Sequence, residues 1–249
     1  MSKTCPPIVL FCDFGLPYTG QMKAQILAGA PEHPIIDLFH DVPAHDVRAG
    51  SVLLAAHAQD FPPGSVFVCV VDPDVGTDAR KPGAVFAGGR WFVGPLNGLF
   101  EHTLRRWPDD ARAYEITWKP ERLSASFHGR DLFAPMAARL ALGNMEGLNS
   151  VDVDGEHRKD LPDDVLAVVY ADSFGNLMTG IRASSIGPED GLAVAGRILS
   201  RQRTFSSPGG ASLFCYENAV GLMEIAANGG NAREILSSEP GAAIKIVQV

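Results

Sequence analysis

The stretch Ile8–Gly29, IVLFCDFGLPYTGQMKAQILAG, predicts the first unit of the fold. Its first five residues are apolar, as expected for a strand that is buried on both faces of a sheet. The acidic Asp13 follows at once. From Tyr18 to Ala28 apolar residues recur at near-helical spacing, and Gly29 ends that pattern. The stretch therefore predicts a strand, a loop and a helix, with a carboxylate where the strand ends.

The same alternation of strands and helices continues along the N-terminal part of the chain. Further strands are expected at Ile35–Phe39, Ser65–Val71, Ala84–Phe86 and Trp91–Val93, and helices at Val47–Ala58, Asn97–Arg106 and Leu132–Leu142. Continuous apolar strands that are separated by helices predict an α/β domain whose parallel sheet is covered on both faces.

The character of the chain changes at Ser150–Asp164, which is charged and poor in large apolar side chains, as domain linkers are. We therefore place an α/β domain at residues 1–155 and a smaller second domain at residues 165–249. One short helix is expected at Asn231–Leu236. Six short strands are expected in the second domain, at Val165–Tyr170, Leu177–Ile181, Ala193–Leu199, Leu213–Tyr216, Leu222–Ala227 and Ile244–Val249. This spacing predicts a small β-barrel or sandwich.

Composition narrows the class of protein. The chain has 249 residues, of which 46% are hydrophobic and 20% charged, as in ordinary soluble globular proteins. It has neither an apolar run of the roughly 20 residues that a membrane span needs nor a secretory signal, so we expect a cytoplasmic protein. The formal net charge of -8 disfavours nucleic acid and anionic membranes as partners. The histidines show no HxH or HExxH spacing, so no metal site is expected.

Two apolar strands each end in an aspartate, Asp13 and Asp72. In an open parallel sheet, ligands bind at the carboxyl ends of the strands. A carboxylate there can accept two hydrogen bonds from a sugar diol or orient a proton donor. The alternative is that each aspartate only caps the helix or turn that follows it.

Two loops carry further polar side chains. The loop after the strand Ser65–Val71 brings Arg80 back toward Asp72, so the two can pair. The segment SFHGRDLFAP gathers His128, Arg130 and Asp131 just before a helix, where Asp131 is a candidate N-cap. A lone histidine more often has a structural role, but the polar neighbours of His128 favour a functional role.

In the second domain, DSFGNLMT joins two strands through a tight turn and presents Asp172 and Asn176. An amide and a carboxylate can bind a ligand there, although both residue types are common turn formers. No Walker A, GxGxxG or GxSxG sequence occurs, so neither a phosphate loop nor a serine hydrolase is indicated.

Six segments occur in an order that resembles one family: DFGL, VVDPDVGT, FVGPLNGLF, FHGRDLFAP, DSFGNLMT and YENAVGLMEIAANGGNA. The pattern is similar to the S-adenosylmethionine hydroxide adenosyltransferases, once called DUF62, which are related to fluorinating and chlorinating enzymes. The resemblance covers nearly the whole chain. It implies an N-terminal α/β domain, a C-terminal β-barrel, no cofactor, and a homotrimer whose sites lie between subunits.

The resemblance also implies a reaction, in which water displaces methionine from C5′ of S-adenosylmethionine and leaves adenosine. Asp72, Arg80 and His128 match the set that orients and activates the water. Whether Asp72 or His128 takes the proton stays open. The positions that match substrate-binding residues are Asp13 for the ribose, Asn176 for adenine, Asp172 for the methionine amine, and Asn218.

The chain departs from the family pattern mostly at the methionine end. Two residues, one of them acidic, are missing between Leu16 and Pro17, and Ala219-Val220 replaces a small hydroxyl residue. Without a gap, Ala79 rather than Arg80 aligns with the family arginine. These departures predict a weakened grip on the amino-acid portion. An equally weighted alternative is that backbone groups fill these gaps and activity is normal. Two other functions are also left open, a sensor that binds adenosine or S-adenosylmethionine without turnover, and a halogenase.

Overall fold

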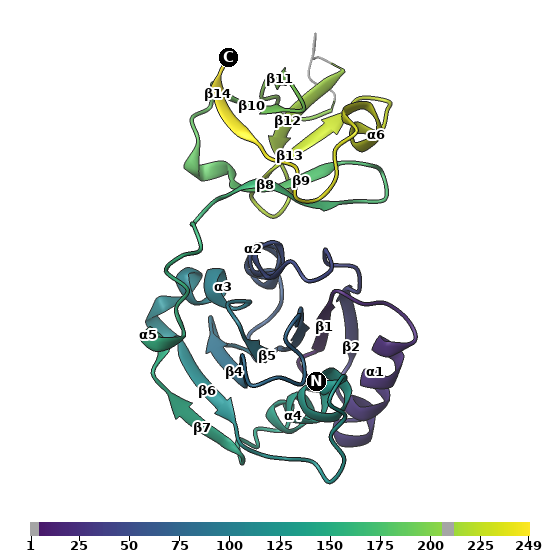
Figure 1. The fold of residues 1–249 in the computed structure, drawn as a ribbon, viewed down its shortest axis with the longest axis vertical. Coiled ribbons are helices and arrows are strands. Elements are labelled where there is room, and N and C mark those ends of the chain that lie inside the picture. The colour runs from purple at the N-terminus through teal and green to yellow at the C-terminus, as the bar shows by residue number, and fades with distance from the viewer. Residues whose placement is uncertain (1–4, 206–211) are drawn as a thin grey trace. The chain divides into compact units, whose positions relative to one another are not determined.

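The computed structural model describes residues 5–205 and 212–249, and it forms two compact units, Met1–Leu161 and Pro162–Val249 (Figure 1). The division falls within the charged segment that marks the change of character in the sequence. Part of that segment is ordered, because β7 (Leu148–Val151) and the short helix α5 (Val153–Glu156) lie in it. No helix among the described residues is long and apolar enough to cross a membrane.

The N-terminal unit is built on one seven-stranded sheet with the order β2-β1-β3-β5-β4-β6-β7. Its strands, besides β7, are β1 (Ile8–Cys12), β2 (Ile35–Phe39), β3 (Val66–Val70), β4 (Lys81–Ala87), β5 (Arg90–Leu96) and β6 (Arg112–Ile116). The strands β2, β1, β3 and β5 are parallel, while β4, β6 and β7 are antiparallel. The expected parallel sheet is confirmed for β2, β1, β3 and β5, while the Gly88-Gly89 turn makes β4 and β5 a hairpin and β6 and β7 extend the sheet by antiparallel pairing.

Helices cover both faces of this sheet (Figure 1). They are α1 (Tyr18–Gly29), α2 (Val47–Ala58), α3 (Glu101–Arg106) and α4 (Ala134–Ala141). The helices α1 and α4 pack on one face, where Met22 and Ile26 meet the alternate side chains Ile8 and Leu10 of β1. The helices α2 and α3 cover the other face. Burial from both sides explains why β1 and β3 are apolar throughout.

The register of β1 and β3 brings the two aspartates to one edge. Cys12 at the end of β1 lies opposite Val70 at the end of β3. Asp13 and Asp72 follow these strand ends, so both leave the sheet at its carboxyl edge, as expected for a ligand site in a parallel sheet.

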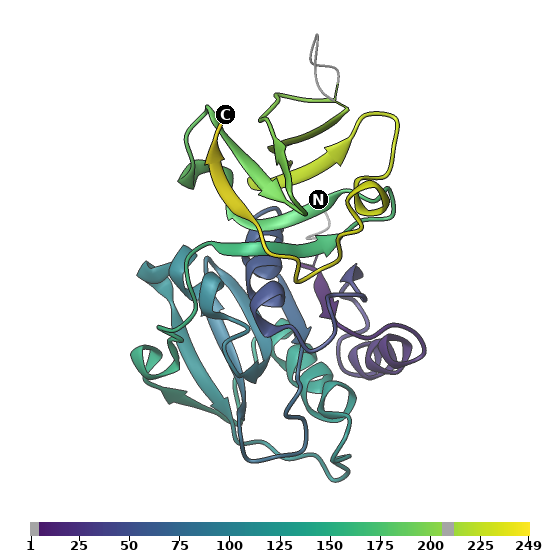
Figure 2. The same ribbon diagram turned by 45° about the horizontal axis from the view of Figure 1, so that its top comes forward.

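The C-terminal unit contains a three-stranded sheet, β11-β10-β14, and a four-stranded sheet, β12-β13-β9-β8 (Figure 2). Its elements are β8 (Val165–Ala171), β9 (Leu177–Arg182), β10 (Asp190–Val194), β11 (Arg197–Leu199), β12 (Leu213–Glu217), β13 (Leu222–Ala227), β14 (Lys245–Gln248) and the helix α6 (Ala232–Leu236). The two sheets share one apolar core. Single bridges join Ala167 to Ala243 and Arg201 to Cys215 at the sheet edges, an arrangement compatible with the predicted barrel.

One strand prediction in this unit is wrong. Ala193–Leu199 is not a single strand but the hairpin of β10 and β11. Ala195 and Gly196 both have positive φ and form the turn between them.

Candidate functional site

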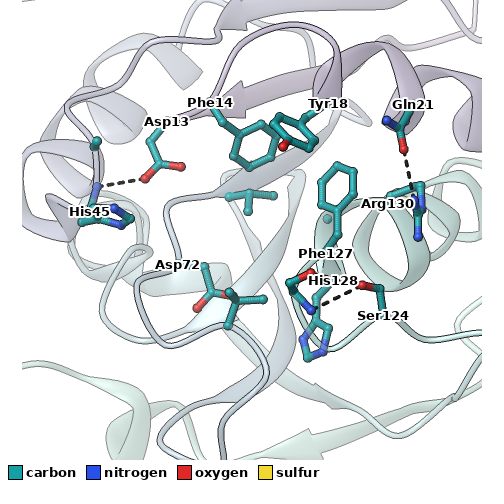
Figure 3. A pocket seen from close by; sticks show the side chains of 15 residues that line it. Asp13, Phe14, Tyr18, Gln21, His45, Asp72, Ser124, Phe127, His128 and Arg130 are labelled. Atoms are coloured by element: carbon teal, nitrogen blue, oxygen red, sulfur yellow. Dashed lines mark hydrogen bonds between the residues drawn. The ribbon is translucent and has the colours of Figure 1, made fainter.

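A pocket of about 620 Å³ opens in the N-terminal unit at the carboxyl ends of β1 and β3. Figure 3 shows Asp13 and Asp72 on one side of this pocket and Phe127 and His128 on the other. The structure thus brings together three of the residues that the sequence singles out, from segments far apart in the chain. Arg80 is not one of the lining residues, but it donates a hydrogen bond to Asp72.

Asp13 does not cap the following helix. The residue before α1 is Pro17, and no side chain caps that helix. Instead the Asp13 carboxylate accepts a hydrogen bond from the backbone N–H of His45 at 2.9 Å. Burial raises the pKa of Asp13, which that N–H partly opposes. The capping alternative therefore fails here, and a half-buried carboxylate with free acceptor capacity faces the pocket.

Asp72 and Arg80 form a buried ion pair. Arg80 Nε donates to Asp72 Oδ1 at 3.0 Å, and Arg80 Nη2 donates to Oδ2. Their side chains are only 3% and 2% exposed. The two parallel bonds hold the carboxylate in one orientation. Arg80, and not Ala79, is thus the residue that reaches Asp72.

Two loops meet where this pair is made. Gly76 lies between Asp72 and Arg80 and has a φ of +78°. A Cβ there would lie 2.1 Å from the carbonyl oxygen of Ala125, in the loop that leads to His128. A glycine is therefore required for the Asp72 loop to pack on the His128 loop.

His128 is bonded to the same arginine. Arg80 Nη2 lies 2.9 Å from His128 Nδ1. Because a guanidinium has only donors, Nδ1 must accept, and the neutral ring carries its proton on Nε2. Burial and the nearby Arg80 charge lower the pKa of His128, which favours this neutral form. His128 therefore presents an N–H and has no free lone pair.

Three aromatic side chains, missed in the sequence, line the same pocket. The rings of Phe14, Tyr18 and Phe127 meet edge to face, with centroids 5.3 to 6.0 Å apart. Tyr18 begins α1 directly after Pro17. Phe14 and Phe127 stand within motif segments, but only the folded loops reveal that the three rings meet.

The expectation that Asp131 caps a helix is wrong. The segment Gly129–Phe133 is a π-helical turn that continues into α4, with Asp131 inside it. Its carboxylate accepts from the backbone N–H of Ser124 at 2.8 Å and pairs with Arg130. Hydrogen bonding to Arg130 lowers the pKa of Asp131. Asp131 thus fixes the loop before His128.

The C-terminal unit has its own pocket of about 570 Å³. It is lined by Asp172, Phe174, Asn176, Phe205, Tyr216, Glu224, Ala227, Gly229 and Gly230. Asp172 and Asn176 do build the β8–β9 turn, since Asp172 accepts from the N–H groups of Phe174 and Asn176 and from the Asn176 amide. They also face the pocket, so the turn role and the pocket role coexist.

Glu224 is a carboxylate in this pocket that the sequence did not single out. It is only 6% exposed, on the buried strand β13. Its oxygens accept from the Tyr216 hydroxyl and, at 3.0 Å, from the Asn218 amide. Within the described parts of the chain, neither Glu224 nor Asp172 pairs with a lysine or arginine. This pocket is therefore acidic and is held together by neutral donors.

Asn218, expected to bind substrate, is not one of the lining residues. Its side-chain oxygen accepts from the backbone N–H groups of Val220 and Leu222, and its amide nitrogen donates to Glu224.

Over residues 5–205 and 212–249, no group of three or more His, Cys, Asp or Glu side chains is arranged to hold a metal ion.

Comparison with known proteins identifies the family. Residues 8–149 match the SAM hydroxide adenosyltransferase N-terminal domain, and residues 166–245 match the C-terminal domain of the same family. The chain belongs to the SAM hydroxide adenosyltransferase family.

Individual relatives agree with this assignment. The chain is 37% identical to the (R)-S-adenosyl-L-methionine hydrolase of Thermus thermophilus, over 97% of this chain and 99% of that protein. A crystal structure of an uncharacterized conserved protein from Thermotoga maritima is 29% identical, with a TM-score of 0.80 over 97% of this chain and 100% of that chain. A fluorinase from Nocardia brasiliensis is 26% identical over 55% of each chain.

Proposed function

We propose that this protein hydrolyses S-adenosylmethionine to adenosine and methionine, with Asp72, Arg80 and His128 as the catalytic residues. The observation that carries the proposal is the hydrogen-bonded set of these three groups, of which Asp72 and His128 line one pocket together with Asp13. The family assignment and the name of the Thermus relative support the same reaction.

The reaction needs no more than a placed water molecule. The water oxygen forms a bond to C5′ of the ribose while the bond from C5′ to sulfur breaks. The electron pair of that bond stays on sulfur, which turns the sulfonium into the neutral thioether of methionine. One water proton leaves, so the products are adenosine, methionine and a proton. Alignment of water, carbon and sulfur supplies most of the catalysis.

Asp72 is the better acceptor for that proton. His128 can take a proton only on Nδ1, and that atom already accepts from Arg80. The oxygens of Asp72 keep lone pairs after pairing with Arg80, and Asp72 lines the pocket. We therefore assign Asp72 as the base and the His128 Nε2–H as a donor that holds the water oxygen.

The other polar groups of the two pockets are suited to bind the remaining parts of the substrate. Asp13 has acceptor capacity for the ribose hydroxyls, since one of its carboxylate oxygens, Oδ2, accepts from the His45 N–H and both oxygens belong to a half-buried side chain that lines the pocket. Asn176 keeps its amide oxygen available for the exocyclic amine of adenine. Asp172 and Glu224, held by neutral donors, are suited to the ammonium of the methionine portion. Glu224 thus offsets the acidic residue that the shortened loop lacks.

Because these groups stand in two units, we propose that complete sites form between subunits of a homotrimer. Mixing an Asp72→Asn protein with a Glu224→Gln protein tests this arrangement. In a mixed trimer some sites combine an intact N-terminal unit with an intact C-terminal unit from another subunit. Activity above that of either variant supports the arrangement, and the absence of any gain after subunit exchange contradicts it.

The function itself is tested by incubating the purified protein with each sulfonium epimer of S-adenosylmethionine and quantifying adenosine and methionine. Equal amounts of both products from the (R) epimer are expected, as the name of the Thermus relative suggests. Chloride or fluoride in the mixture tests the halogenase alternative, which the Nocardia relative motivates. A 5′-halogenated product supports it, and binding without any product supports a sensor.

A further inference from the structure

In the segment FVGPLNGLF, Asn97 comes directly after Leu96, the last residue of β5. We propose that Asn97 is a positioning residue, which fixes the backbone that carries Asp72 and ties it to the segment that leads out of the N-terminal unit. This inference rests on the proposed function, since it takes Asp72 as the group that receives the water proton.

The backbone before Asp72 lies beyond the sheet ladder. The strand β3 pairs with β5 from Val66 to Val68 and ends at Val70. The carbonyl of Val71 accepts instead from the side-chain amide of Asn97, at 3.0 Å. Val71 is fully buried, and a buried carbonyl needs such a partner. Asn97 therefore continues, through its side chain, the pairing that the strand no longer provides.

The orientation of the Asn97 amide is fixed by its other bond. Its oxygen accepts from the backbone N–H of Leu99 at 3.2 Å. A flipped amide would place its nitrogen against that N–H and its oxygen against the Val71 carbonyl. The donor of Asn97 is thus committed to Val71.

The same residue contacts the segment that follows α5. The backbone carbonyl of Asn97 accepts from Arg158 Nη1 at 3.0 Å. The Arg158 N–H in turn donates to Glu101 at 2.7 Å, and the Glu101 side chain is almost completely buried. A continuous set of bonds therefore runs from Glu101 and Arg158 through Asn97 to the residue before Asp72.

This placement matters because Asp72 is held from two directions. Arg80 orients its carboxylate, while Asn97 holds the backbone from which that carboxylate projects. Attack at C5′ depends on alignment, so a small shift of the carboxylate lowers the rate of the chemical step more than it lowers substrate affinity.

The decisive variant is Asn97→Asp. It keeps an oxygen for the Leu99 N–H but replaces the donor to Val71 with a second acceptor. We expect kcat to fall about tenfold with KM changed less than twofold, the loss that one buried hydrogen bond produces. Lowering the pH toward 5 protonates the introduced carboxyl, which then donates to Val71, so the deficit in kcat relative to the unmodified protein shrinks.

Asn144→Ala is the matched control. The side-chain oxygen of Asn144 likewise accepts from the N–H two residues on, in Glu146, but Asn144 lies outside the pocket. It is expected to leave kcat unchanged. Equal losses of kcat in both variants, or a deficit in Asn97→Asp that does not change with pH, would overturn the positioning role.

A readout that needs no turnover separates this inference from the proposed function. The ring ¹⁵N signals of His128 report its bond to Arg80, which also holds Asp72. We expect Asn97→Asp, but not Asn144→Ala, to shift them. A shift in a protein that does not hydrolyse S-adenosylmethionine would retain the positioning role and reject the function. Unchanged signals together with unchanged kcat in a hydrolysing enzyme would reject the positioning role alone.

Discussion

The pockets of the two units handle buried negative charge in opposite ways. In the N-terminal unit, Asp72 is paired with Arg80 inside the protein. In the C-terminal unit, Glu224 and Asp172 meet only neutral donors in the described chain, from a tyrosine, two asparagine amides and backbone N–H groups. Burying a charge without a counter-charge is costly, so the second arrangement is stable chiefly when a ligand brings a cation.

The difference separates two tasks. A group that acts on water must hold one orientation throughout the reaction, and an internal ion pair achieves this before substrate arrives. A group that binds a charged substrate gains most when the substrate supplies the missing partner. The four predictions below test this division, beginning with the largest effect.

Replacing Asp72 with Asn removes the carboxylate of the ion pair in the N-terminal pocket. It leaves Arg80 buried without a carboxylate and removes the acceptor for the water proton. We expect kcat for S-adenosylmethionine hydrolysis to fall by about 10² to 10⁴. Adenosine affinity, measured by calorimetry, should change little. A variant that retains more than a tenth of the activity would contradict the assignment of Asp72 as the base.

Glu224→Gln tests the acidic pocket in the same way. Loss of the carboxylate should weaken binding of S-adenosylmethionine about tenfold or more, because a charged hydrogen bond is lost, while adenosine binds as before. Glu217→Gln is the control, since Glu217 is an exposed carboxylate of the same unit that pairs with Arg201. Equal weakening of adenosine would show that Glu224 reads the base and not the ammonium.

His128→Gln keeps an acceptor for Arg80 and a donor for the water, so we expect kcat to fall only about tenfold. In the unmodified enzyme, burial and Arg80 lower the pKa of His128, so the neutral form persists until the pH falls below the ordinary value near 6.5. Activity should therefore decline on the acid side below about pH 6.5. The Gln variant should lack that decline in its kcat profile, unless His128 is the base, in which case activity disappears at all pH values.

Asp13→Asn should produce the smallest of the four effects, a slight gain in the stability of the folded protein. Burial raises the pKa of Asp13, so the folded protein prefers the protonated carboxyl and loses stability as the pH rises through that raised pKa. The Asn variant avoids this loss. We expect its thermal midpoint at pH 7 to equal or exceed that of the unmodified protein by a few degrees at most, with no gain near pH 3, while adenosine binds more weakly. A lower midpoint at pH 7 would mean that the charge stabilises the fold.

Much of the fold follows from local sequence. The apolar runs of β1 and β3 and their terminal aspartates predict a sheet edge with a site, because period and burial are local signals. The strands β6 and β7, the last two at one end of the sheet, were missed because their polar and half-buried residues lack a continuous apolar run. Their antiparallel pairing depends on contacts distant in sequence.

The residues of the candidate site were likewise only partly predictable from the sequence. Asp13, Asp72 and His128 stand in motif segments and line one pocket. Glu224 looked like one polar residue in an apolar strand, and only its burial beside Tyr216 and Asn218 indicates a role. Three-dimensional contacts show that Arg80, and not Ala79, reaches Asp72. They also show that His128 Nδ1 is the ring nitrogen that accepts from Arg80. Neither contact could be predicted from the spacing of residues in the sequence.

The most direct test of the account is hydrolysis of S-adenosylmethionine in oxygen-18 water, followed by mass spectrometry of the adenosine. Attack of water at C5′ predicts adenosine that is two mass units heavier on its 5′ oxygen, with unlabelled methionine, and formation of that product by the Asp72→Asn protein that is slower by about 10² or more. Adenosine without the label, or labelled adenosine formed equally well without the Asp72 carboxylate, would contradict water attack directed by the Asp72, Arg80 and His128 set.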